Sequence, residues 1–133
     1  MPSNAAFPDA EVARIHAEPD GRKKLEIYGA AYAERAQRAV PIQLLVRDAA
    51  ASDSSAQGVL DQLNRERLDG MTAFGHHLHE SKVLRDDVHT ADAIDVLWLF
   101  TAPEIYERLV MQRGWLPQRF GTWVTQQLIA ALL

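Results

Sequence analysis

The chain has 133 residues, of which 47% are hydrophobic and 24% are charged. This balance predicts one folded domain and argues against a disordered chain, because the sequence carries enough apolar surface to form a core. The net charge of −4 argues against a basic nucleic-acid-binding face, and the absence of cysteine excludes disulfides, thiolate catalysis and cysteine-ligated metals. No signal peptide and no membrane-spanning apolar run is visible, so we expect a cytoplasmic protein without a membrane partner.

The first part of the chain, residues 1–19, is expected to be an N-terminal extension with a short helix from Asp9 to Ala17. A long helix should start near Gly21, where small and apolar residues recur on one helical stripe: Leu25, Tyr28, Tyr32, Ala36 and Ala39. Pro41 should interrupt this helix with a kink, because proline lacks a backbone donor. Beyond the kink a rotated stripe follows, made of Ile42, Leu45, Val46 and Ala49, and the chain turns at residues 51–55.

A second long helix is predicted from an N-cap at Ser52 or Asp53 to about Glu80. One face of this helix is apolar and consists of Leu60, Leu63, Met71, Phe74 and Leu78. Residues 81–89 form a loop, and Thr90 should cap the next helix. No strand pattern occurs anywhere, so we predict an all-α bundle of five to six helices.

The C-terminal segment is unusually apolar. Residues 96–100, VLWLF, cover nearly every direction around a helix axis, and the last six residues, 128–133, are also apolar all round. Pro103 should kink or restart the helix, Gly114 should end it as a left-handed C′ residue, and Pro117 should begin the terminal helix. An apolar chain end must be covered, which favours a dimerisation surface. The alternative is a core helix and a terminus packed within the monomer.

The same segment resembles the C-terminal end of tetracycline-repressor-like (TetR/AcrR) transcription regulators. The resemblance is carried by DVLWLFTAPEIYERLV, by Arg113, Gly114 and Trp115, and by PQRFGTWV. It extends upstream through DGRKKLEIYGAAYAERAQRAVPIQLLVRDAAASD, LDGM and SKVLRDDVHTADAIDVLW, and so covers roughly Asp20 to the end. Each motif is weak, but their order and spacing together are fairly specific. Members of that family begin with a helix-turn-helix domain of roughly fifty residues, for which this sequence shows no counterpart.

The resemblance implies a homodimeric ligand-sensing domain of a transcriptional repressor, spanning residues 20–133 and needing no cofactor. A small, apolar effector would bind among the central helices, and DNA would be contacted only through an N-terminal domain not present here. In the family, the last two helices of each subunit form an intersubunit four-helix bundle. Mapped by position, the interface would contain Ile94, Leu97, Trp98, Tyr106, Leu109, Phe120, Trp123, Val124, Gln127, Leu128, Ala131 and Leu132.

The ligand pocket is predicted from the stripes and carries no family motif. It would be lined by Tyr28, Tyr32, Arg67, Met71, Phe74 and His77. Arg67 lies in the middle of an apolar stripe, where a buried guanidinium needs a partner. It could hold an anionic or carbonyl group of a ligand. It could equally form an internal ion pair, or extend its charged head to solvent along the core.

Catalysis and metal binding find little support in the sequence, and we expect neither an enzyme nor a metal site. His76, His79 and Glu80 could share one helical face with zinc-ligand chemistry, but that face is opposite the apolar stripe and lacks an evident fourth ligand. No phosphate-binding loop or nucleophile elbow is present. Two rival functions remain open, namely a stand-alone helical dimerisation or scaffold module and a small metal-dependent helical enzyme.

Overall fold

The structure, a computed structural model, describes residues 7–133, and this part of the chain is all-helical without a strand. The predicted fold class is therefore confirmed. The elements, in chain order, are α1 (Asp9–Ala17), α2 (Gly21–Ala50), α3 (Ser54–Glu80), α4 (Thr90–Phe100), α5 (Pro103–Tyr106), the π-helical turn η1 (Glu107–Gln112) and α6 (Pro117–Leu132). None of these helices combines the length and the apolar character that crossing a lipid bilayer requires.

Side-chain caps start both long helices. The Asp20 carboxylate accepts a hydrogen bond from the backbone N–H of Arg22 at 2.9 Å, and α2 begins at the next residue after Asp20. The predicted cap of α3 is Asp53, whose carboxylate accepts from the N–H of Ser55 at 2.8 Å. Each cap satisfies a helix-terminal donor that would otherwise lack a partner.

The predicted roles of Gly114 and Pro117 at the helix boundaries are confirmed, whereas the predicted role of Thr90 needs a correction. Thr90 is the first residue of α4 and not its cap; the cap position is His89, whose N–H donates to the Asp92 carboxylate at 3.3 Å. Gly114 has a φ of +74°, the left-handed conformation that favours glycine at a helix end. Pro117 is the first residue of α6, where its missing donor costs nothing.

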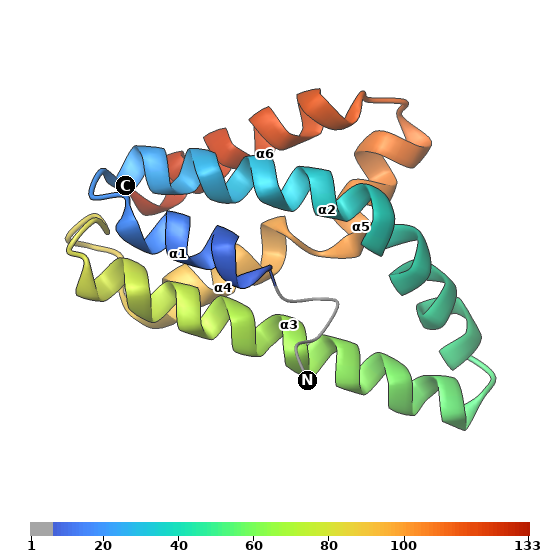
Figure 1. Cartoon of the computed structure of the whole chain (residues 1–133). Coiled ribbons are helices and arrows are strands. Elements are labelled where there is room, and N and C mark those ends of the chain that lie inside the picture. The colour runs from blue at the N-terminus through green and yellow to red at the C-terminus, as the bar shows by residue number, and fades with distance from the viewer. Residues whose placement is uncertain (1–6) are drawn as a thin grey trace.

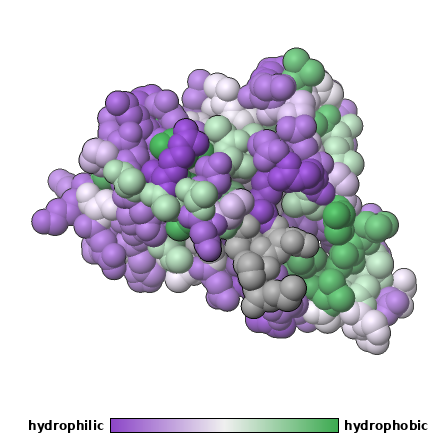
Figure 2. All heavy atoms as spheres, viewed as in Figure 1, coloured by the Kyte–Doolittle hydropathy of each residue, from purple (hydrophilic) through white to green (hydrophobic). Residues whose placement is uncertain are grey.

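Pro41 does not interrupt α2. The helix continues for nine residues to Ala50, although its axis bends in the second half (Figure 1). The predicted stripe beyond the bend is largely uncovered, since Ile42 and Leu45 are exposed. Figure 2 shows hydrophobic side chains gathered over this half of α2. Proline therefore redirects the helix without ending it, and an apolar patch remains on the surface.

Four helices, α2, α3, α4 and α6, form the bundle. Helix α2 packs against α3 and α6, and α4 packs against the same two helices, so the four close a ring around the core. Helix α1 lies across α2 and α3 on the outside of this ring (Figure 1). Its Ile15 is buried in the common core, so the predicted N-terminal extension packs directly on the bundle.

The apolar C-terminal segment is mostly covered by its own chain. Half of the predicted interface residues are buried in the core of a single subunit: Leu97, Tyr106, Phe120, Val124, Leu128 and Leu132. The prediction that a partner covers these six side chains is therefore corrected. The alternative of a terminus packed within the monomer holds for them, because α6 lies between α2 and α4 with its apolar face inward.

Helices α2 and α6 approach closely where both carry glycine. A Cβ placed on Gly29 would lie 1.8 Å from Oγ1 and 3.0 Å from Cβ of Thr125, and a Cβ on Gly121 would lie 2.6 Å from the Cβ of Ala33. A larger side chain at either glycine would force the helices apart.

Replacing Gly29 by Leu is expected to lower the free energy of unfolding by about 1–3 kcal/mol, the usual cost of overpacking a close contact. Gly58→Leu is the matched control, because nothing lies within 4 Å of an added Cβ on Gly58 in α3. The control should leave stability unchanged or raise it by up to about 1 kcal/mol through helix propensity. Urea denaturation followed by circular dichroism measures both, and equal effects would contradict the close α2–α6 contact.

Candidate ligand-binding site

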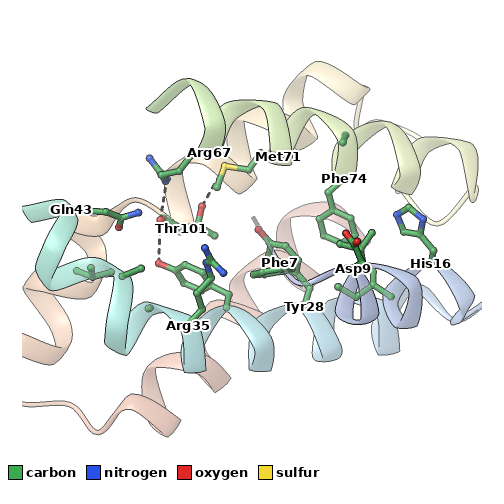
Figure 3. A pocket seen from close by; sticks show the side chains of 18 residues that line it. Phe7, Asp9, His16, Tyr28, Arg35, Gln43, Arg67, Met71, Phe74 and Thr101 are labelled. Carbon is green, nitrogen blue, oxygen red and sulfur yellow. Dashed lines mark hydrogen bonds between the residues drawn. The ribbon is translucent and has the colours of Figure 1, made fainter. Parts of the chain in front are cut away.

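A cavity of about 320 Å³ lies between α1, α2 and α3, with the residue after α4 at its edge (Figure 3). Its volume lies at the lower end of the range of small-molecule pockets. Of the six predicted ligand-binding residues, five line this cavity: Tyr28, Tyr32, Arg67, Met71 and Phe74. The structure thus brings two separately predicted stripes, one on α2 and one on α3, together around a single space.

The backbone carbonyl of Thr101, directly after α4, organises the polar end of the cavity. It accepts hydrogen bonds from the Tyr32 hydroxyl on α2 and from Nη2 of Arg67 on α3, both at 3.1 Å (Figure 3). The Thr101 hydroxyl donates to the carbonyl of Leu97 at 2.6 Å. Both lone pairs of the Thr101 carbonyl therefore have partners, and three helices meet at one oxygen.

Arg67 is 8% exposed and its guanidinium carbon lies 4.3 Å from the ring centre of Trp98. Burial lowers the pKa of this guanidinium, with the neighbouring Tyr32 and Tyr28 acting in the opposite direction. No salt bridge joins it to a carboxylate of residues 7–133. Neither predicted alternative, an internal ion pair or a solvated head group, describes Arg67. Its charge is held by a carbonyl and an aromatic face.

Aromatic rings form the apolar part of the cavity wall. Tyr28 stacks on Phe74 with ring centres 4.5 Å apart, and Phe7 lies 5.2 Å from Tyr28. Val12 and Ile15 of α1 extend this wall. Burial raises the pKa of the Tyr28 hydroxyl above its usual value, so this tyrosine stays neutral. The cavity is consequently amphipathic, with a polar end near Thr101 and an apolar body.

The prediction that His77 lines the cavity is not met; His77 lies behind the wall. Its ring stacks on that of His16 with centres 4.0 Å apart, and His16 is the residue that lines the cavity. Nε2 of His77 accepts a hydrogen bond from Nζ of Lys24 at 2.9 Å. An ammonium can only donate, so Nε2 of His77 carries no proton in this contact.

Lys24 anchors the end of α1. Its side chain is 2% exposed, and Nζ donates to the carbonyls of Ile15 at 2.9 Å and His16 at 3.3 Å besides His77. Burial lowers the pKa of this ammonium, with Glu18 acting in the opposite direction. Three acceptors thus compensate the buried charge, and the same contacts hold α1 over the cavity.

Sequence reasoning missed several lining residues, notably Arg35, Gln43, His16 and Thr101. The first two could have been found, because Arg35, Ala39 and Gln43 continue the stripe of Tyr28 and Tyr32 at helical spacing. His16 and Thr101 carry no such signal, since the cavity reaches them only after α1 and α4 have packed.

The predicted solvent-exposed histidines are found on the surface. His76 and His79 are exposed on α3. Within residues 7–133, no group of three or more His, Cys, Asp or Glu side chains lies close enough together to hold a metal ion.

Comparison with known proteins adds no assignment. No family model matches this chain, and searches of curated proteins and of solved structures give no significant match. The resemblance to TetR-like regulators therefore stays a prediction from the sequence motifs.

The Lys24–His77 contact predicts a pH-dependent stability. Burial, together with the electrostatic effect of the neighbouring His16 and Lys24, lowers the pKa of His77 below its ordinary value of 6.5, with Glu80 acting in the opposite direction. The folded state therefore resists protonation more than the unfolded state does. The contribution of unprotonated His77 to the free energy of unfolding is complete above about pH 6.5 and decreases as the pH falls toward the lowered pKa of His77.

Between pH 7.5 and 5.5, His77→Gln should lose less unfolding free energy than the unsubstituted protein, because glutamine does not titrate. His76→Gln changes the neighbouring exposed histidine and should retain the full pH dependence. Urea denaturation at several pH values provides the measurement. Identical pH profiles for His77→Gln and the unsubstituted protein would show that His77 does not couple protonation to folding.

Proposed function

We propose that this chain is the ligand-sensing and homodimerisation domain of a TetR-like transcriptional repressor. In this proposal a small effector occupies the cavity between α1, α2 and α3. DNA binding belongs to a helix-turn-helix domain that is not part of residues 7–133. The observation that supports the proposal best is the amphipathic cavity itself, because a scaffold module would have no need of such a space within a small helical bundle.

The contacts around the cavity suggest how an effector would act. Tyr32 on α2 and Arg67 on α3 face the cavity and also donate to the carbonyl of Thr101 at the end of α4. A ligand that contacts these two side chains would favour one position of α4 relative to the long helices. Since α4 packs on α6, this preference would reach the proposed subunit interface as a population shift.

The proposed dimer surface is an aromatic face formed by α4, α6 and the residues just before α6. Trp123 lies with its ring centre 5.9 Å from Phe100 and 6.0 Å from Trp115, and all three rings are only partly buried. The adjoining Leu116 is exposed. Among the predicted interface residues outside the core, Leu109, Trp123, Gln127 and Ala131 stay partly exposed, whereas Ile94 and Trp98 contact α3. Partly exposed aromatic rings are typical of protein interfaces.

A ligand effect is expected in thermal denaturation. A panel of small amphipathic compounds should contain members that raise the melting temperature of the chain, because a ligand that binds only the folded state stabilises it. Gly70→Leu should abolish this stabilisation, since Gly70 lines the cavity and an added Cβ there meets no atom within 4 Å. The new side chain would fill or block the space, and its Cβ would meet no neighbouring atom.

Gly58→Leu is the control for Gly70→Leu, because it makes the same change in the same helix away from the cavity. It should leave ligand stabilisation intact. A panel without any stabilising compound, or equal binding by the Gly70→Leu variant, would contradict the sensing function and favour a scaffold module.

Light scattering behind a sizing column should give about twice the chain mass of 14.9 kDa, and this value should persist on dilution. Leu116→Glu should produce the monomer, because it places a charge on the proposed aromatic face. Leu45→Glu is a matched control on the apolar patch of α2, since the two leucines are 70% and 71% exposed. A monomeric unsubstituted protein, or a monomer produced by the control instead, would contradict the proposed interface.

A further inference from the structure

We propose that the cavity selects an amphipathic monocarboxylate, with the carboxylate bound by Arg35 and the apolar body held between the aromatic rings of Phe7, Tyr28 and Phe74. This inference rests on the proposed ligand-sensing function and specifies its ligand class.

The inference depends on one buried nitrogen of the Arg35 guanidinium, Nη2. Arg35 lies on α2 one turn beyond Tyr32, and its side chain is among those that line the cavity (Figure 3). Its Nη2 atom is inaccessible to solvent and finds no hydrogen-bond acceptor among the described residues. A buried donor on a charged group without an acceptor is costly, and native structures rarely retain one without a reason.

No salt bridge joins Arg35 to a carboxylate of residues 7–133. Glu34, the adjacent residue, forms a two-point ion pair with Arg38 on the exposed side of α2. Asp9, the acidic residue of the cavity wall, lies beside Phe74 and away from Arg35 (Figure 3). The Arg35 guanidinium therefore has no carboxylate partner among these residues, whereas the exposed guanidinium of Arg38, one turn along the same helix, is paired.

Both arginines of the cavity retain their positive charge. Burial lowers the pKa of Arg35, as it does for Arg67, but arginine stays protonated in proteins. The Arg67 guanidinium already donates to the Thr101 carbonyl and lies over Trp98. Arg35 is consequently the group with a free donor, and Arg67 adds positive charge to the same end of the cavity.

The shape and lining of the cavity favour a single negative charge. Figure 3 shows Arg35, Arg67 and Gln43 toward one end of the cavity, and Phe74, Asp9 and His16 toward the other. A carboxylate presents two oxygens in a plane, which matches the fork of a guanidinium. A dianion such as a phosphate monoester would need further donors, and the acidic Asp9 on the cavity wall opposes a doubly charged ligand more strongly than a singly charged one.

The test uses isothermal titration calorimetry with matched pairs of probes, namely 4-phenylbutanoate and octanoate with their primary amides. The unsubstituted chain should bind at least one carboxylate roughly tenfold to hundredfold more tightly than its amide, as expected for one charge-assisted hydrogen bond in a desolvated site. Arg35→Met should reduce carboxylate affinity by a similar factor and leave amide affinity within about threefold, because methionine keeps the apolar stem.

Arg38→Met is the matched control, since Arg38 lies one turn farther along α2 with its guanidinium in an exposed ion pair. It should leave both affinities unchanged. Without ligand, Arg35→Met should melt at the same temperature as the unsubstituted chain or higher, because the substitution removes an unpaired buried donor. A clear loss of stability would instead indicate that Arg35 holds the fold together, and would overturn its assignment as the ligand's partner.

The remaining outcomes separate this inference from the function on which it rests. Amides that bind as tightly as carboxylates, or an Arg35→Met variant that weakens both equally, would overturn the carboxylate assignment while ligand binding stands. Tighter binding of octyl phosphate than of octanoate would also overturn it in favour of a dianion. If neither the carboxylates, the amides nor the wider panel of compounds bind, both the assignment and the sensing function are contradicted.

Discussion

The carbonyl oxygen of Thr101 is the point on which the arrangement of this bundle depends. It is the first carbonyl after α4, and it receives donors from Tyr32 on α2 and Arg67 on α3. A helix C-terminus has carbonyls without intrahelical partners, and satisfying this one from two other helices fixes where α4 ends relative to both. The same two side chains face the cavity. Bundle geometry and the proposed ligand site are therefore joined by one acceptor, and a change in either affects the other.

Two buried cations and one half-buried cation, Lys24, Arg67 and Arg35, lie around the cavity. Lys24 has three acceptors, Arg67 has a carbonyl and an indole ring, and Arg35 has a donor without an acceptor. The three side chains therefore differ in how completely the protein's own groups bind their positive charge. The first holds α1 in place and the second holds α4. The third, Arg35, still has a hydrogen-bond donor without an acceptor, and the ligand class is therefore inferred from this residue.

The apolar C-terminal segment has two apolar faces, one in the core of the bundle and one on its outside. Its inward face, which includes Phe120 and Val124, completes the core between α2 and α4, where close contacts at Gly29 and Gly121 allow the helices to meet. Its outer face carries Trp123 beside Phe100 and Trp115. A helix that is apolar all round must be covered on more than one side. Here the chain covers one side, and the proposed dimer would cover the other.

The sequence by itself determined the features that depend on neighbours along the chain. Asp53 caps α3, Gly114 permits a left-handed turn and Pro117 opens α6, because capping and backbone preference act within one turn of helix. The helical period also placed Tyr28, Tyr32, Met71 and Phe74 on the right faces. Only the tertiary structure decided which element covers each face. The burial of Phe120 within one subunit, the partner of Arg67 and the placement of His77 behind His16 all depend on contacts between segments far apart in sequence, which periodicity cannot specify.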